Sequence, residues 1–193
     1  METSNIRYVE IGPENEALYF KGFAQVYQEA FSGPPYFEEY DEEMVDNLAW
    51  KPHRRLGCII LALDGERAVG LGCCLPLARI SANCPNSLFL LSLRRRPGLP
   101  FHTMETCYMS ELAVLDEYRN RGIGTELIKR RLDWAKSQGI NYYLMRTAAE
   151  GSNSLSLYSR LGAKIVPGLE QDMSKDGVGT ASQKRIFLFG PVS

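Results

Sequence analysis

The chain has 193 residues and a mass of 21.7 kDa, which favours one domain of ordinary size over residues 1–193. Its 45% hydrophobic and 23% charged residues are the usage of a globular protein that can bury its own core. The 22 Lys and Arg residues nearly balance the 23 Asp and Glu residues, which argues against a dedicated nucleic-acid binder. No apolar run approaches the roughly 20 residues that span a bilayer, and no signal-peptide pattern opens the chain. We therefore expect a cytoplasmic protein with no membrane and no nucleic-acid partner.

Two scarce residue types narrow the chemistry. The five cysteines are odd in number and include no C-x-x-C spacing, so we expect neither a disulfide framework nor a zinc site, and no metal. Because His53 and His102 are the only histidines, a histidine-centred triad is disfavoured. A general base is therefore expected to be a carboxylate, or a water molecule that a carboxylate holds.

The spacing of apolar residues predicts a succession of strands and helices. The predicted elements are, in chain order, strand 6–11, helix 13–33, helix 38–50, strand 57–63, strand 68–77, strand 107–115, helix 123–137, strand 141–146, helix 154–161, strand 163–166 and strand 184–189. This order indicates a mixed α/β sheet with helices on its faces.

Prolines and glycines mark the boundaries between these elements. Asp64-Gly65 stands between two apolar runs and predicts a hairpin, and Lys51-Pro52 should end the second helix. Residues 79–103 are interrupted by prolines, which predicts an excursion with a short turn of structure over 87–93. Residues 167–183 are polar and rich in Gly and Ser, which predicts a loop.

The most informative stretch joins a strand to a helix through the sequence R-N-R-G-I-G. The first turn of a helix has free backbone N–H groups and the positive end of the helix dipole. Gly122 and Gly124 have no Cβ, so a phosphate can approach the backbone closely. Arg119 and Arg121 add positive charge beside it. These features predict an anion site, most simply one for a pyrophosphate.

Other interpretations of the two glycines are open on this evidence alone. They can simply form a tight turn between strand and helix. A Rossmann dinucleotide site would need a third glycine where Leu127 stands, and a P-loop would need a Gly-Lys pair, which the chain lacks. A nucleotide-binding module is therefore the weaker alternative.

The surroundings of these glycines resemble the acyl-CoA motif of the GNAT superfamily of N-acetyltransferases. Arg119, Gly122 and Gly124 fill the fixed positions of that motif, with the strand of residues 112–114 before them and an amphipathic helix after them. Further on, L-Y-S-R-L-G-A at 157–163 is similar to the family's L-Y-x-x-L-G-F segment.

A third segment, F-S-G-P-P-Y at 31–36, resembles the end of the family's first helix. The resemblance implies a mixed, mostly antiparallel twisted sheet with helices on both faces, and a CoA-binding core over about 105–166. It implies acetyl-CoA as co-substrate, with the pantetheine arm on the strand and the pyrophosphate at the helix start. The residues that it implies for cofactor binding are Leu112, Ala113, Val114, Arg119, Asn120, Arg121, Gly122, Ile123, Gly124, Thr125 and Asn153. Asn153 is also a good N-cap residue for the short helix, so both roles stay open for it.

The resemblance also implies an activity, the transfer of an acetyl or other short acyl group from acetyl-CoA to a primary amine by direct attack in a ternary complex. Tyr158 matches the family's tyrosine near the thioester sulfur, where it would protonate the departing thiolate. Glu111 stands where many members carry a carboxylate that acts as base, directly or through water. Strand alternation puts Glu111 and Leu112 on opposite faces, so which of them faces the cleft is open. A non-catalytic CoA-binding regulatory module on the same fold is the alternative function.

The acceptor side is less defined. The segments that the resemblance implies for it are 31–50, 79–103 and 167–183. Acidic residues crowd positions 38–46 and can attract a cationic amine, whereas Arg94-Arg95-Arg96 can hold a carboxylate or a phosphate. These two features favour different acceptors, so the sequence predicts only a small-molecule or peptide amine. Tyr36, after two prolines, is the one substrate-side residue predicted. A monomer and a homodimer are both compatible with the sequence.

Overall fold

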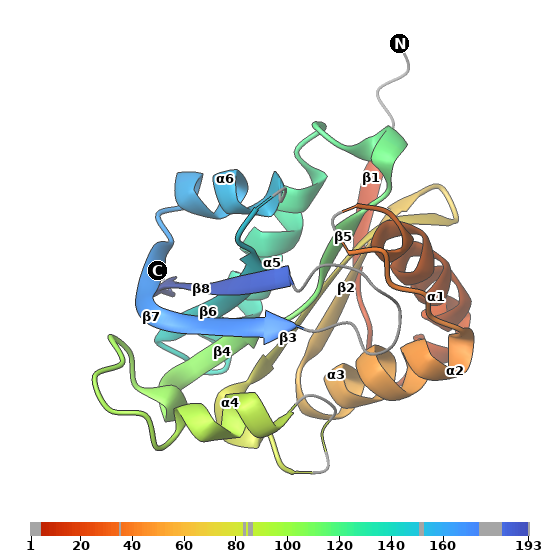
Figure 1. The fold of residues 1–193 in the computed structure, drawn as a ribbon. Helices are drawn as coiled ribbons and strands as arrows, with labels where there is room; N and C mark the ends of the chain where they lie inside the picture. Colours follow the sequence, from red (N-terminus) through yellow and green to blue (C-terminus); the bar gives the residue numbers. More distant parts are fainter. Residues whose placement is uncertain are drawn as a thin grey trace.

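The computed structural model describes residues 5–34, 36–82, 84, 87–150, 153–173 and 183–192, without the side chains of Asn153, Met173 and Gln183. The strands are β1 (Ile6–Glu10), β2 (Cys58–Asp64), β3 (Arg67–Pro76), β4 (Thr106–Met109), β5 (Leu112–Val114), β6 (Tyr142–Ala148), β7 (Lys164–Met173) and β8 (Gln183–Pro191). The α-helices are α1 (Glu16–Ser32), α2 (Glu42–Val45), α3 (Lys51–Leu56), α4 (Ser87–Leu93), α5 (Ile123–Ser137) and α6 (Asn153–Arg160). The ribbon in Figure 1 carries these labels.

Within the described residues, eight strands form one sheet in the order β1-β2-β3-β4-β6-β8-β7, with β5 paired to β3. The pair β4–β6 is parallel, and the other pairs are antiparallel. The predicted mixed, mostly antiparallel sheet is therefore confirmed. The hairpin predicted at Asp64-Gly65 is confirmed as well, since Asp64 pairs with Arg67 across the turn.

Helices cover both faces of the sheet, as predicted (Figure 1). Strand β2 shows how, because it is buried on both sides. Its residues Ile59, Leu61 and Leu63 pack into the core beneath α1, while Ile60 and Ala62 pack into a second core beneath α5. A third core lies under α4 and the β6–β8 pair. The helix α4 confirms the short element predicted inside the 79–103 excursion.

The single strand predicted over 107–115 is wrong, because the chain breaks it into β4 and β5 at Ser110 and Glu111. Strand β3 pairs with β4 only at its end, through Leu75 and Pro76, and with β5 further back. Strand β4 instead continues along β6, so the two halves diverge and leave the sheet split. Two bonds close the base of this split, from Cys73 N to Glu111 O (2.9 Å) and from Ser110 N to Cys73 O (3.1 Å).

The second predicted helix, 38–50, is wrong at both ends. It begins only after Asp41, whose side chain accepts a hydrogen bond from Met44 N at 2.7 Å and caps the helix. It continues past Pro52 as α3 because a π-helical turn, Asp46–Trp50, comes before it. In that wider turn Lys51 N bonds to Asp46 O, and Pro52 follows in the first turn of α3, where its missing N–H costs little.

The loop predicted over 167–183 is also wrong where the structure describes it. Strand β7 runs to Met173 instead of ending at 166, and it pairs with β8 after a register shift between Ile165 and Glu170. The polar residues of this segment pair across the strands, as in the contact of Lys184 with Glu170 at 2.5 Å. Such a polar strand lacks the apolar alternation that sequence patterns detect. The first helix differs less, beginning at Glu16 rather than at 13.

Candidate functional site

The predicted anion site has the geometry of an open helix start. Gly122 is the N-cap of α5 and has a φ of +82°, in the left-handed region that glycine reaches without strain. The first main-chain bond into the helix comes from Glu126 N to Gly122 O, at 3.0 Å. The N–H groups of Ile123, Gly124 and Thr125 therefore have no partner within the helix. They combine with the dipole of a 15-residue helix into a site for negative charge.

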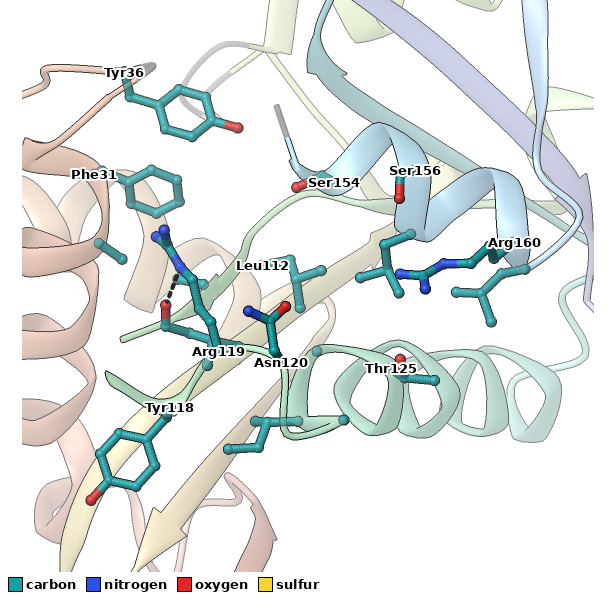
Figure 2. A pocket seen from close by; sticks show the side chains of 18 of the residues that line it. Phe31, Tyr36, Leu112, Tyr118, Arg119, Asn120, Thr125, Ser154, Ser156 and Arg160 are labelled. Atoms are coloured by element: carbon teal, nitrogen blue, oxygen red, sulfur yellow. Dashed lines mark hydrogen bonds between the residues drawn. The ribbon is translucent and has the colours of Figure 1, made fainter. Parts of the chain in front are cut away.

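A cavity of about 810 Å³ opens in front of this helix start (Figure 2). It extends along β5 and lies between α5, α6 and the end of α1. Of the predicted residues, those that line it are Tyr36, Leu112, Ala113, Val114, Arg119, Asn120, Gly122, Ile123, Gly124 and Thr125. Arg121, Glu111 and Tyr158 do not line it. The side chain of Asn153 lies outside the described part of the chain, so its two predicted roles stay predictions.

The sequence indicated the segments 31–50 and 105–166 but did not single out the lining residues that α1, α6 and the turn before α5 contribute. The lining residues that it did not name are Ala30, Phe31, Pro34, Tyr118, Ser154, Ser156, Leu157, Arg160 and Leu161. Figure 2 shows Ser154, Ser156 and Arg160 on α6, facing the start of α5 across the cavity. The spacing of Ser154, Leu157 and Leu161 is that of one helix face, which could have revealed the contribution of α6.

Positive charge reaches the cavity from a different pair of arginines than predicted. Arg119 lines it, while its side chain bonds to Val114 O at 3.3 Å and to Asp116 Oδ1 at 2.7 Å. Arg121 instead donates to Glu117 O at 2.6 Å and lies over the ring of Tyr118 at 5.0 Å. The second cavity arginine is Arg160 of α6, which the glycine motif does not include.

Tyr158 lies behind the wall of the cavity rather than on it. Its side chain is 5% exposed and packs in the core beneath α5. Burial raises the pKa of its phenol to about 12, and a hydrogen bond with the cavity residue Ser154 works against that rise. The phenol is therefore protonated at all ordinary pH values, the state in which it can donate a proton.

Glu111 stands at the split between β4 and β5, half-buried and outside the cavity lining. Burial raises the pKa of its carboxyl, and Glu38 raises it further, while Arg146, Arg131 and Arg185 lower it. Its carboxyl therefore lies among charges from the loop after α1, from β6 and from β8. A carboxyl with a raised pKa is a better proton acceptor than an ordinary one.

Two buried side chains anchor the split, Arg131 through main-chain oxygens and His53 through the side chain of Ser110. Arg131 of α5 is fully buried, and its Nη1 donates to Cys73 O and to Glu111 O, both at 3.0 Å. The buried ring of His53 contacts Ala49 O and Ser110 Oγ, both at 2.5 Å. Because a carbonyl can only accept, Nδ1 carries the proton and Nε2 accepts from Ser110. Burial lowers the pKa of His53 to about 4, which keeps the ring neutral.

The predicted acceptor-side features are largely engaged elsewhere. Asp46 pairs with Lys51 at 2.6 Å, so not all of the acidic run is free to attract a ligand. Arg94 donates to the main-chain oxygens of Leu77 and Ile80, and Arg96 to that of Gly168. No described residue of 79–103 lines the cavity. Tyr36 does line it, with its ring 5.3 Å from that of Phe31.

The described residues contain neither a candidate metal centre nor a helix that could span a membrane. Within the part of the chain that is described, no group of three His, Cys, Asp or Glu residues could hold a metal ion. No described helix has the length and apolar character to cross a bilayer.

Comparison with known proteins gives one family. Residues 22–163 match the model of the acetyltransferase (GNAT) family. A 55-residue segment, 28% of this chain and 37% of the relative, is 36% identical to N-alpha-acetyltransferase 30 of Schizosaccharomyces pombe. The chain thus spans little more than a third of that relative's length.

Solved structures resemble the whole fold at low identity. An N-acetyltransferase from Staphylococcus aureus Mu50 superposes with a TM-score of 0.68 and 12% identity, over 98% of this chain and 100% of that one. The structure of yncA, described as a putative acetyltransferase from Salmonella typhimurium with its cofactor acetyl-CoA, gives a TM-score of 0.64 at 14% identity. It covers 97% of this chain and 94% of that one.

Proposed function

Because the chain belongs to the acetyltransferase (GNAT) family, we propose that it transfers an acetyl or other short acyl group from acetyl-CoA to a primary amine. The observation that carries this proposal is the cavity of about 810 Å³, which joins the open start of α5 to the edge of β5 that faces away from β3. One continuous cavity would thus accommodate both a pyrophosphate at the helix start and the arm that follows it along the strand. A nucleotide site would need only the first of these.

The pantetheine arm of CoA contains amide groups and would bond to the edge of β5 that faces away from β3, where Val114 O accepts from Arg119 Nε at 3.3 Å. The residues on either side of β5 bond to β3: Cys73 N donates to Glu111 O (2.9 Å), and Leu115 N donates to Val69 O (3.0 Å). In an antiparallel pair the residues that bond to the partner strand alternate with residues that do not. The main-chain groups of Leu112 and Val114 therefore face away from β3, toward the split.

The pyrophosphate would lie on the N–H groups at the start of α5, with Arg119 and Arg160 beside it. This arrangement supports the cofactor residues predicted from the motif, with two changes. Arg160 joins them, and Arg121 leaves them because its guanidinium packs on the ring of Tyr118 and does not line the cavity.

The transfer itself needs one proton acceptor and one proton donor. The amine nitrogen bonds to the acetyl carbon, the carbon–sulfur bond breaks, and CoA leaves as a thiolate. An alkyl ammonium has a pKa near ~10, so at pH 7 a base must remove its proton before it attacks. We assign this role to Glu111, acting through water because its carboxyl does not line the cavity. Tyr158 would donate a proton to the thiolate, with Ser154 between it and the cavity. The second proton, which the nitrogen loses as the amide forms, would return to the Tyr158 phenolate through water, so that CoA is released as a thiol and the phenol is restored.

A thiol-release assay tests the proposal. The protein is mixed with acetyl-CoA and a broad panel of primary amines, and free CoA is measured with a thiol dye. Amine-dependent release is expected. Binding of CoA without release for any amine would instead favour the alternative, a non-catalytic CoA-binding regulatory module.

The variant Tyr158→Phe tests the role of the phenol. We expect kcat to fall by roughly 10² to 10⁴-fold, with little change in CoA affinity, because only proton donation is lost. Tyr143→Phe is the matched control, since Tyr143 is also buried, at 3% exposure, and lies on β6 outside the cavity lining. Unchanged turnover in Tyr158→Phe would remove this residue from the mechanism.

A further inference from the structure

A second polar cluster lies where the sheet splits, and we call it the acceptor-side cluster. It consists of Glu38, Glu111, Arg146, Gln171 and Arg185. Strand register brings the last three together, because Gln171 of β7 is directly opposite Arg185 of β8, and Arg185 is opposite Ala148, two residues after Arg146 on β6. All three thus share one face of the sheet, and Arg146 Nη1 donates to Gln171 Oε1 at 2.8 Å.

The cluster lies next to the cavity. The guanidinium of Arg185 lies over the ring of Tyr36, 4.7 Å from its centroid, and Tyr36 lines the cavity. Figure 2 shows the Tyr36 ring at the end of the cavity near α1, away from Arg160 and Thr125. One aromatic ring therefore separates Arg185 from the space at that end. The carboxyl of Glu111 is in the same charged surroundings, since both arginines of the cluster act on its pKa.

Arg185 has more hydrogen-bonding capacity than its described neighbours use. Its side chain is 7% exposed, and its Nη1 has no hydrogen-bond partner among the described residues. Its Nη2 lies 3.7 Å from Glu38 Oε1, which is too long for a hydrogen bond. The other oxygen of Glu38 accepts from Tyr40 Oη at 2.8 Å. A buried guanidinium donor without a partner is costly, and such groups need an explanation such as an absent ligand.

The shape of the unused group indicates what that ligand is. A guanidinium presents parallel N–H donors that match the two oxygens of a carboxylate, and stacking on an aromatic ring fixes its plane. We propose that the acceptor amine carries a carboxylate, which Arg185 binds as the specificity-determining residue. This proposal rests on the proposed acetyl transfer. The amine of that acceptor would then point toward Glu111. A free amino acid and a peptide with an acidic first residue both meet this description.

Matched acceptors test the proposal and separate these two sources. Glycine is compared with glycinamide, and a peptide that begins with Asp is compared with one that begins with Asn. We expect the carboxylate member of at least one pair to have a kcat/KM higher by roughly 10- to 100-fold, mainly through KM. Which pair shows the effect tells whether the carboxylate belongs to a free amino acid or to a side chain.

The variant Arg185→Gln should abolish this preference. The kcat/KM of the carboxylate member should fall by roughly 10-fold or more, while that of the amide member stays within about twofold. Comparing the ratio of the two members between variant and parent cancels any difference in amine basicity. Lys184→Gln is the matched control, because it removes the same charge from the neighbouring, exposed position, where Lys184 pairs with Glu170 at 2.5 Å.

Two results would overturn the proposal: equal use of both members by the parent protein, or an equal fall for both members in Arg185→Gln, which a merely structural arginine would give. If Arg185→Gln does not fold, Arg185→Lys retains the charge without the paired donors, and its carboxylate preference should be reduced several-fold. An unchanged preference contradicts the proposal.

Failure of the proposed function would look different. The protein would then bind CoA but release none with any amine. In that case the role of Arg185 is tested by binding: the unfolding temperature of the CoA-bound protein is compared with N-acetylglycine and with N-acetylglycinamide present. Selective stabilisation by the carboxylate supports the role of Arg185, and its absence overturns that role.

Discussion

Replacing Gly124 by alanine should separate CoA binding from stability. Gly124 is in the first turn of α5, where an added Cβ would be 3.5 Å from Leu157 Cδ2 and 4.0 Å from Val114 Cγ2. These are ordinary contacts, so the free protein can accept the methyl group. Alanine also has the higher helix propensity, by up to about 1 kcal/mol. The free protein should therefore unfold at the same temperature or about 2–4 °C higher.

Binding should change in the opposite direction. The methyl group of Gly124→Ala would point into the cavity beside the N–H groups that the pyrophosphate needs. If the phosphate is pushed back from one of them, one charge-assisted hydrogen bond worth about 1.5–3 kcal/mol is lost. The Kd for CoA should then rise by roughly 10- to 100-fold. At a CoA concentration about 100 times the parent's Kd, the parent gains about 2.7 kcal/mol of stability, and a 100-fold weaker variant gains only about 0.4 kcal/mol.

Calorimetric titration with CoA, together with thermal unfolding with and without it, measures both quantities. Gly139→Ala is the control, because Gly139 follows the other end of α5 outside the cavity lining, has a φ of +70° in the left-handed region, and has nothing within 4 Å of an added Cβ. It should lose about 1–2 kcal/mol of stability through backbone strain alone. CoA binding to Gly124→Ala as tight as to the parent would refute the placement of the pyrophosphate on this helix start.

Three further predictions concern charged and titratable groups. Glu111→Gln should lower kcat by roughly 10²-fold or more. It should also raise the free energy of unfolding at pH 7, because the raised pKa of Glu111 means that folding disfavours its ionised form. This gain in stability should vanish below about pH 4, where the carboxyl is protonated in both states. Urea unfolding of variant and parent at both pH values measures the difference. His53 has a pKa of about 4 in the folded protein against 6.5 in the unfolded chain, so between these pH values only the unfolded chain takes up the proton. The free energy of unfolding should therefore fall by up to about 3 kcal/mol as the pH falls from 6.5 to 4. Unfolding of His53→Gln, measured over the same pH range, should lack this loss. Arg160→Gln should weaken CoA binding by roughly 10-fold and reduce its salt dependence, whereas Arg121→Gln should leave it within about twofold, as measured by titration at two ionic strengths.

The helix-start geometry that we assign to the cofactor could be predicted from the sequence because it is local. The strand edge, the turn and the first turn of α5 all lie within residues 112–125. Glycine spacing and helix-start patterns report on such a contiguous segment directly. The same patterns could not tell Arg121 from Arg119, because the side-chain direction depends on the ring of Tyr118 beneath it.

The acceptor-side cluster could not be predicted in the same way, because strand pairing assembles it from distant segments. Gln171 meets Arg146 only through the register of β7 and β6 on β8, and apolar spacing does not give register. One local hint existed for Arg185. In the last strand it alternates in phase with Phe187, which is fully buried, so a strand interpretation already places this arginine on an inward face.

The split in the sheet escaped prediction for a related reason. The run C-Y-M-S-E-L-A-V-L is apolar on both sides of Ser110 and Glu111, so its two halves follow one pattern. What separates them is a difference in partners: β4 pairs with β6 and with the end of β3, whereas β5 pairs with β3 alone among the described strands. Those partners are distant in sequence, and the break becomes evident only when the whole sheet is assembled.

Helix α5 links the two parts of the candidate site mechanically. Its first turn faces the cavity, and two turns later Arg131 reaches the split and holds Glu111 O and Cys73 O. Gly72 makes room for this arginine, since an added Cβ there would be 3.1 Å from Arg131 Cδ and Nε. Because a helix is stiff along its axis, an anion at the start of α5 and the backbone of the proposed base would be held at a fixed separation. Burying Arg131 is costly, because its Nη2 has no hydrogen-bond partner among the described residues. Its role in holding the split gives a reason for this cost, which side-chain packing alone would not give.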